Sequence, residues 1–443
     1  MLFAGVGFLL GGIDDLAVDA VYFARYMWRR ARGLRDPTAA DLPPVTGRFA
    51  IFVPTWQEAD VIGAMLSTAL ARFTHPDVRI YVGLYPNDRA TIDAAAAVAE
   101  GEPRIQLVIG DDPGPTTKAA NLNAIWLGLL RDEVANGMRA DAIVLHDAED
   151  VVHPDELRVY AAYLREFDAV QLPVAPLPDT GSRYVAGSYI DEFTEAHGKQ
   201  LVVRQAIGAG LPFAGVGCAI RRDMLGRVAD SRGGMPFDAG SLTEDYELGL
   251  TIAAMGGRGA LAWVTEADRR TPVAVRAYFP ATFEAAVRQK ARWMIGIAFA
   301  GWDRTGWGRP TALAEHWMRM RDRRAPLGVL IVMTAYAAMV LWSLSVVAHA
   351  LSGRAGSYPS DWVATLLVFN AALLVWRLAM RVAFVGKAEG WREGLRAVPR
   401  MAVGNMIALF AAQRALFRYV AMLRGAPTQW DKTVHRFPTE VMR

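Results

Sequence analysis

A short apolar run that ends in a cluster of acids limits the possible folds of this chain more than any other stretch. Residues 142–145 (AIVL) are long enough for one buried strand, and residues 146–150 (HDAED) follow directly with three carboxylates. Alternate positions of an extended chain project to one side, so Asp147 and Glu149 can share a divalent ion. The same acids could instead cap a helix that begins near residues 153–157 (HPDEL), and this pattern alone does not separate the two interpretations.

The region around this run alternates between strand-like and helix-like segments. Such alternation predicts an α/β fold with a mainly parallel sheet covered on both faces. No glycine-rich loop follows the first predicted strand, where residues 54–58 read PTWQE, so a classical dinucleotide or P-loop site is not expected. The predicted strands are 48–53, 78–84, 104–109, 142–145 and 168–174, and the predicted helices are 57–72, 89–100, 116–135 and 154–166.

Apolar segments outside this region predict a membrane protein. Residues 326–351 contain no Asp, Glu, Lys or Arg, and residues 361–386 form a second candidate span. The stretch 397–420 is interrupted by polar residues and is predicted to be an interfacial helix. Arginine clusters at 29–35 and 319–324 place the α/β domain in the cytoplasm. The net charge of only +3 in 443 residues does not favour nucleic acid as a partner.

These patterns divide the chain into five parts. They are an N-terminal transmembrane helix (1–30), a cytoplasmic domain (48–275), interfacial helices (276–325), two transmembrane helices (326–386), and an interfacial helix with a cytoplasmic tail (387–443). The first helix contains acids at positions that are costly in lipid. Asp15 and Asp19 lie four apart on one face, so we expect them to meet one or more of four later arginines. Those arginines are Arg377, Arg381, Arg414 and Arg418.

Seven short motifs follow one another along the chain. They are VPT (53–55) with Glu58, ND (87–88), Lys118 with NLN (121–123), DAE (147–149), GVG (215–217) with RR (221–222), TED (243–245) and QKARW (289–293). In these motifs and their order the chain resembles membrane-embedded glycosyltransferases of family 2, which include polysaccharide synthases, over about residues 48–300. The HDAED form, the early acidic helix and the tail WDKTVH (430–435) are most similar to synthases of the phage adsorption protein B type.

The resemblance implies a glycosyltransferase-A domain that binds a nucleotide-sugar, with a role for each matching residue. Asp147 and Glu149 would bind Mg²⁺ or Mn²⁺, although a departure from Asp-x-Asp leaves Asp150 as an alternative to Glu149. Asp245, next to Glu244, would be the general base, whereas acids at the start of a helix are otherwise explained by capping. Lys118 could face a phosphate or simply be solvated. The nucleotide-sugar would further contact Thr55, Glu58, Asp88, Asn121, Gln289, Arg292 and Trp293.

The expected function is inverting, metal-dependent transfer from a UDP-sugar to a polysaccharide or lipid-linked acceptor at a bacterial inner membrane. The narrower resemblance favours an N-acetylated hexosamine as the donor sugar. Two transmembrane helices and the first helix are few for a channel through which the enzyme could export its own polysaccharide. This favours an export partner or a homo-oligomer. Two other hypotheses are transfer of a single sugar to polyprenyl phosphate, and a non-enzymatic membrane receptor. The tail 430–435 is either a gating segment or a packing strand.

Overall fold

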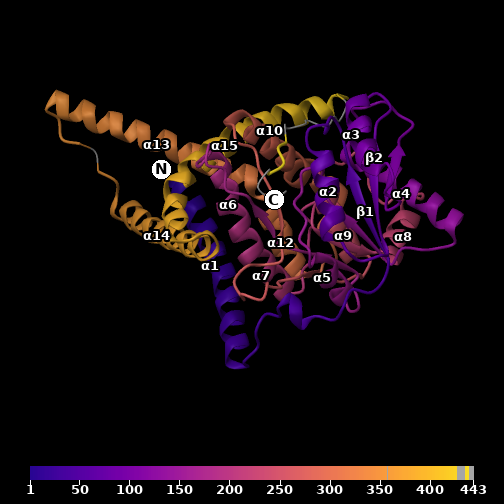
Figure 1. The fold of residues 1–443 in the computed structure, drawn as a ribbon. Coiled ribbons are helices and arrows are strands. Elements are labelled where there is room, and N and C mark those ends of the chain that lie inside the picture. The colour runs from indigo at the N-terminus through magenta and orange to yellow at the C-terminus, as the bar shows by residue number, and fades with distance from the viewer. Residues whose placement is uncertain (357, 427–434, 439–443) are drawn as a thin grey trace.

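Seven strands form the central sheet in the computed structural model, which describes residues 1–356, 358–426 and 435–438 (Figure 1). These strands are β1 (Phe49–Pro54), β2 (Val78–Leu84), β3 (Ile105–Ile109), β4 (Ala142–Leu145), β5 (Ala169–Gln171), β7 (Cys218–Arg221) and β8 (Gly259–Leu261). Their order in space is β3-β2-β1-β4-β7-β5-β8, and only β7 runs antiparallel to its neighbours. A separate parallel pair joins β6 (Val174–Pro176) to β9 (Val275–Ala277).

Helices cover both faces of this sheet because strand side chains alternate between two hydrophobic cores. In β1, Ile51 and Val53 lie in one core, while Ala50 and Phe52 lie in the other. The first core is closed by α2 (Ile62–Arg72), α3 (Arg89–Ala99) and α5 (Glu156–Tyr163). The second is closed by α4 (Lys118–Asn136), α8 (Arg222–Ser231) and α9 (Glu244–Ala254). The predicted α/β fold with a mainly parallel sheet is confirmed.

The structure corrects two of the predicted segments and contains a strand of the central sheet that was not predicted. The helix predicted from residue 57 begins at Ile62, since Gln57 has a φ of 53° and cannot continue a right-handed helix. The strand predicted over 168–174 is two strands in different sheets, β5 and β6, with Pro173 between them. The antiparallel strand β7 was not predicted, because four residues are too short to show a periodic pattern.

Further helices connect the sheet to the apolar C-terminal part. They are α6 (Val185–Glu195), the π-helix η2 (Ala196–Gln200), α7 (Leu201–Ala206), α10 (Phe283–Met294), the π-helix η3 (Ile295–Phe299), α11 (Ala300–Thr305) and α12 (Leu313–Arg323), whereas the short 3-10 helix η1 (Ala39–Asp41) precedes β1. Among the described residues, three helices are long and apolar enough to cross a membrane. These are α13 (Ala325–Ser352), α14 (Asp361–Glu389) and α15 (Trp391–Leu423). Figure 1 shows α13 and α14 projecting away from the sheet domain, and α15 returning over it.

The predicted spans 326–351 and 361–386 coincide with α13 and α14, whereas the predicted interfacial helix is only part of α15. Its polar residues argued against a span, but two of them, Arg400 and Asn405, have partners within the protein. Arg400 is 2% exposed, and it donates to the Arg183 carbonyl at 2.7 Å and pairs with Asp191 at 3.2 Å. Because α15 packs along α6, α10 and α14, it ties the apolar helices to the sheet domain. Its position relative to a bilayer stays a prediction.

The N-terminal helix α1 (Leu2–Ala31) begins between the apolar helices and continues along the sheet domain. Its glycines allow close packing, since a Cβ on Gly7 would lie 2.6 Å from Ile331 of α13 and one on Gly12 would lie 2.7 Å from Leu373 of α14. α1 is not among the three helices named above as apolar enough to cross, so the transmembrane assignment of residues 1–30 stays a prediction.

The acids of α1 have partners, as expected, although only some of them are the predicted ones. Asp15 pairs with Arg377, which confirms that part of the prediction, and also with Arg324 at 2.7 Å. For Asp19 the prediction was wrong, since its carboxylate binds Lys199 of η2 at 2.7 Å. Arg381 pairs with Glu195 instead, at 3.0 Å. These buried charges join α1 to the apolar helices and to the sheet domain.

Candidate active site

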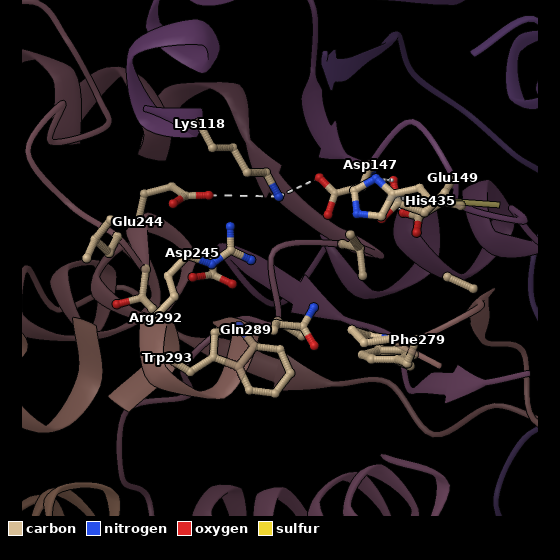
Figure 2. Close-up of a pocket in the computed structure, with 18 of the residues that line it drawn as sticks. Lys118, Asp147, Glu149, Glu244, Asp245, Phe279, Gln289, Arg292, Trp293 and His435 are labelled. Atoms are coloured by element: carbon tan, nitrogen blue, oxygen red, sulfur yellow. Dashed lines mark hydrogen bonds and ion pairs between the residues drawn. The ribbon is translucent and has the colours of Figure 1, made fainter. Parts of the chain in front are cut away.

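A polar pocket lies beyond the end of β4, between the sheet and α10. A site outside the carboxyl ends of parallel strands is the usual place for a ligand in open α/β sheets. Segments that are far apart in the sequence meet there (Figure 2). Its polar lining includes Thr117, Lys118, Asp147, Glu149, Asp150, Ser241, Thr243, Glu244, Asp245, Gln289, Arg292 and His435, and its apolar lining includes Val174, Phe193, Val216, Phe279 and Trp293.

The three acids that follow β4 differ in where their carboxylates point. Asp150 is 2% exposed, and its Oδ2 lies 3.0 Å from both His146 Nδ1 and the backbone nitrogen of Asp147. His146 is fully buried and contacts Glu156 at 2.8 Å through its other nitrogen. Asp150 is therefore occupied in holding the loop. Asp147 and Glu149 are the acids that this geometry leaves to face a ligand.

Lys118, at the start of α4, is enclosed by acids rather than solvated. Its Nζ lies 2.5 Å from Asp147 Oδ1 and 3.8 Å from Glu244 Oε1, and it donates to the Gly215 carbonyl at 3.3 Å (Figure 2). Burial disfavours the charged amine, but the neighbouring carboxylates outweigh it and raise the pKa of Lys118. A permanent positive charge therefore stands between the two acidic parts of the pocket.

The acids at the start of α9 face the pocket instead of capping the helix. Within the described residues the side chain of Thr243 makes no capping hydrogen bond. Burial raises the pKa of Glu244 to about 7 and also raises the pKa of Asp245. Asp245 Oδ1 accepts a hydrogen bond from the Tyr246 backbone at 2.8 Å, which fixes the carboxylate. Gly215 lies against its other oxygen, since a Cβ there would be 2.7 Å from Asp245 Oδ2.

Helix α10 forms one wall of the pocket with the side chains of Gln289, Arg292 and Trp293 (Figure 2). Gln289 Oε1 and Arg292 Nε are buried, and neither atom has a hydrogen-bond partner among the described residues. Buried polar atoms without partners are costly, so their presence indicates that a polar ligand binds here. The Trp293 ring is held edge-on to Tyr189, with ring centroids 6.1 Å apart.

The other four predicted nucleotide-binding residues are not among those that line the pocket, and each contacts another part of the protein. Thr55 donates to the Gly83 carbonyl at 2.7 Å, and Asn121 donates to the Thr55 carbonyl at 3.2 Å. Asp88 caps α3, accepting from the backbone nitrogens of Gln57 at 2.5 Å and Thr91 at 3.4 Å. Glu58, the fourth, contacts His435. The predicted contacts of all four with a nucleotide remain predictions.

A family model described as glycosyltransferase-like family 2 matches residues 44–296, which is more than half of the chain. The chain belongs to this family. It is a glycosyltransferase by class, and the matched residues contain every element of the pocket except the C-terminal segment.

Two relatives of this glycosyltransferase confirm the narrower resemblance. They are bacteriophage adsorption protein B of Escherichia coli strain K12 and bacteriophage N4 adsorption protein B of E. coli O157:H7. Each is 34% identical to this chain over 461 aligned residues and covers 97% of it. The chain spans 61% of the length of these relatives.

The fold of the family 2 enzyme is shared with a solved structure from an archaeon. This is the mannosyltransferase PcManGT from Pyrobaculum calidifontis, solved in complex with GDP-Man and Mn²⁺. The alignment has a TM-score of 0.51 and covers 92% of this chain and 99% of that chain. At 19% identity the likeness shows the fold, including the helices outside the sheet domain.

His435 lines the pocket, and its contacts with acids of the pocket edge were not predicted from the sequence. The sequence placed it in a tail that is either a gating segment or a packing strand; residues 430–434 of that tail lie outside the described residues. His435 Nδ1 lies 2.9 Å from Glu58 Oε1 and 3.3 Å from Glu149 Oε2. Burial disfavours its charged form, but these carboxylates outweigh burial and raise the pKa of His435 to about 9. No local pattern places a C-terminal residue beside β4, so the sequence held no signal for this contact.

Proposed function

We propose that this glycosyltransferase is an inverting, metal-dependent membrane enzyme that transfers a sugar from a UDP-sugar to a growing polysaccharide. The observation that carries the proposal is the pocket itself. It gathers Asp147, Asp245 and Arg292 from three elements that are far apart in the sequence. An acceptor base, cation ligands and groups for a diphosphate are the components that sugar transfer from an activated donor requires.

Asp147 and Glu149 fit a divalent cation of the Mg²⁺ or Mn²⁺ class. Both offer carboxylate oxygens, the ligands that such cations prefer. Burial raises the pKa of Glu149 to about 8 with the help of the Asp147 charge, although His435 opposes the shift. A cation would offset this repulsion, and the similar mannosyltransferase holds Mn²⁺. When bound, the cation supplies positive charge to the departing diphosphate.

Asp245 is placed to remove the proton of the acceptor hydroxyl. One of its oxygens is held by the Tyr246 backbone, while the other is turned toward Gly215. Burial raises its pKa, which makes the carboxylate a stronger base near neutral pH. As the hydroxyl attacks the anomeric carbon from the side opposite to the leaving group, the configuration of the sugar inverts. Glu244 is the adjacent acid, and its pairing with Lys118 helps to hold the start of α9.

The cationic and aromatic side chains of the pocket are suited to binding a nucleotide-sugar donor. Lys118 and Arg292 can neutralise phosphate oxygens, and Gln289 Oε1 can accept a hydrogen bond from a sugar hydroxyl. Trp293 offers an aromatic face for a sugar ring. The contact with Tyr189 keeps the Trp293 ring in position. We further propose a UDP-linked N-acetylated hexosamine as the donor sugar.

We propose that synthesis takes place at the cytoplasmic face of a bacterial inner membrane. The arginines that precede α13 favour the cytoplasmic side for the catalytic domain. Membrane lipid, a lipid-linked or polysaccharide acceptor, and an export partner or second copy are the proposed partners. The QKARW motif on α10 supports polymer extension rather than transfer of a single sugar.

The test is transfer by the full chain purified in detergent, with a panel of UDP-sugars and Mn²⁺. We expect UDP release and a labelled polymer with one donor, and loss of both in Asp245→Asn. Asp230→Asn, at an exposed position of α8, should transfer normally. A product of one sugar on polyprenyl phosphate would replace the polymerase proposal. Normal transfer by Asp245→Asn would show that another group is the base.

A further inference from the structure

The charges that border two apolar helices meet at the N-terminal helix α1, whose first residues lie between α13 and α14 (Figure 1). Arg324 directly precedes α13, and residues 325–352 contain no Asp, Glu, Lys or Arg. Arg377 is the first charged residue after the apolar stretch 362–376 of α14. Both arginines bind the carboxylate of Asp15, Arg324 at 2.7 Å. Where α13 and α14 span a bilayer, this cluster therefore lies at the level of the lipid headgroups.

The cluster carries more positive than negative charge. Its two carboxylates are those of Asp14 and Asp15, and its three guanidiniums are those of Arg321, Arg324 and Arg377. Arg321 and Arg324 each bind both carboxylates, and Arg377 binds that of Asp15. Three cations thus share two anions, which leaves one positive charge in the cluster without a counterion.

The adjacent buried ions do not supply that counterion, because they balance one another. Lys199 pairs with Asp19 at 2.7 Å and with Glu195 at 2.9 Å. Arg381 pairs with Glu195 at 3.0 Å. These two cations and two carboxylates are neutral as a group, so the positive charge beside them remains for an external anion.

Arg377 is the most accessible cation of the cluster. Its side chain is 40% exposed, compared with 30% for Arg324 and 10% for Arg321. Nη1 is the nitrogen that binds Asp15, whereas Nε and Nη2 have no hydrogen-bond partner among the described residues. These two N–H groups point from the same edge of the guanidinium, which is the geometry that binds two oxygens of one phosphate.

Exposed apolar side chains adjoin both accessible arginines. Leu327 of α13 is 53% exposed and Leu374 of α14 is 46% exposed. Leu327 follows Arg324 by three residues, and Leu374 precedes Arg377 by three, so each leucine lies on the same helix face as its arginine. Unbalanced positive charge next to exposed apolar surface fits a ligand that has an anionic head and hydrocarbon chains.

We propose that this cluster binds an anionic phospholipid, with the phosphate held by Arg377 and Arg324 and the acyl chains lying along α13 and α14. The inference rests on the part of the proposed function that places these helices in a membrane. A lipid with one net negative charge supplies the missing counterion, whereas a zwitterionic lipid brings a cation of its own. A lipid-linked acceptor must reach Asp245, but no residue of the cluster lines the active-site pocket, so we assign the site to a phospholipid.

The test compares phosphatidylglycerol with phosphatidylcholine of the same acyl chains, added in equal amounts to the full chain in detergent. Native mass spectrometry measures how much of each lipid stays bound. We expect the wild type to retain phosphatidylglycerol preferentially, and Arg377→Gln to weaken its binding about tenfold or more, the loss typical of a hydrogen bond to a charged group. Asp15 keeps Arg321 and Arg324 in this variant, so the fold should persist. Arg131→Gln, at an exposed position of α4, removes the same charge and should bind like the wild type.

Thermal unfolding gives a second readout on the same proteins. Phosphatidylglycerol should raise the melting temperature of the wild type more than phosphatidylcholine does, since a ligand of the folded state stabilises it, and Arg377→Gln should lose this difference. Equal retention of the two lipids by the wild type, or unchanged binding by Arg377→Gln, would overturn the inference. Polyprenyl phosphate retained in preference to phosphatidylglycerol, and lost in Arg377→Gln, would assign the cluster to the acceptor lipid instead.

Sugar transfer in detergent separates this inference from the proposed function. Arg377 lies outside the pocket, so Arg377→Gln should transfer sugar normally. A wild-type chain that transfers sugar but shows no lipid preference leaves the proposed function standing and removes the lipid site. Lipid preference without transfer of any sugar has the reverse meaning.

Discussion

Substitution of Gly215 by alanine tests whether sugar transfer requires the present position of the Asp245 carboxylate, independently of whether the protein folds. An alanine Cβ would lie 2.7 Å from Asp245 Oδ2 and 3.3 Å from Lys118 Nζ. The first distance is too short for a contact to carbon and the second is tighter than most such contacts, so the carboxylate must turn away from its present position. Its other oxygen is tied to the Tyr246 backbone, and the rotation therefore breaks or distorts that hydrogen bond as well.

Two effects of different size follow from this substitution. Gly215 has a φ of 80°, and an L-residue held in that region costs about 1–2 kcal/mol of folding stability. Displacement of a catalytic group by about 1 Å can lower the rate about 100-fold. We therefore expect Gly215→Ala to fold with a modest loss of stability and to lose about two orders of magnitude in kcat.

The matched control is Gly208→Ala. Gly208 has a similar φ of 75°, but a Cβ there meets nothing within 4 Å among the described residues. It should show the same loss of stability with normal sugar transfer. Thermal unfolding in detergent and initial rates of UDP release measure the two quantities. If Gly215→Ala transferred sugar at the wild-type rate, Asp245 would not need its present position, and the assignment of the base would be wrong.

Two further predictions concern the buried charges and the buried histidine. Lys199 binds both Asp19 at 2.7 Å and Glu195 at 2.9 Å, so Lys199→Met should cost about 3–5 kcal/mol, measured by thermal unfolding against the exposed control Lys387→Met. A loss below about 1 kcal/mol would contradict it. Burial lowers the pKa of His197 to about 4, so folding stability should fall by up to about 3 kcal/mol as the pH drops from about 6.5 toward 4. His197→Asn should flatten this dependence, and an unchanged slope in chemical denaturation would refute it.

The sequence predicted the parts of the fold and pocket that depend on local pattern. The apolar run 142–145 with its following acids, and the alternation of strands and helices, correspond to β4 and its neighbours. Lys118, Asp147, Glu149, Glu244, Asp245, Gln289, Arg292 and Trp293 all line one pocket. Each of these belongs to a short motif whose role the resemblance to family 2 glycosyltransferases implies, whereas local pattern alone would have explained Lys118 by solvation and the acids of α9 by capping.

The features that could not be predicted depend on contacts between distant segments. β7 inserts between β4 and β5 because of tertiary pairing, and four residues carry no signal for it. Lys199 becomes the partner of Asp19 only because η2 packs against α1. His435 reaches Glu58 across most of the length of the chain. In all three cases sequence spacing says nothing about proximity, since the fold alone creates it.

The packing of α15 connects the apolar helix α14 to the helix that carries Trp293. α15 starts directly after Gly390 at the end of α14, and its Ala411 and Ala415 pack against Ala291 and Ile295 of the α10–η3 segment. Closely packed helices move together when one of them is displaced. If α14 spans a bilayer as proposed, we expect a change in bilayer thickness that tilts α14 to shift α10 as well, and so to alter how Trp293 holds a sugar.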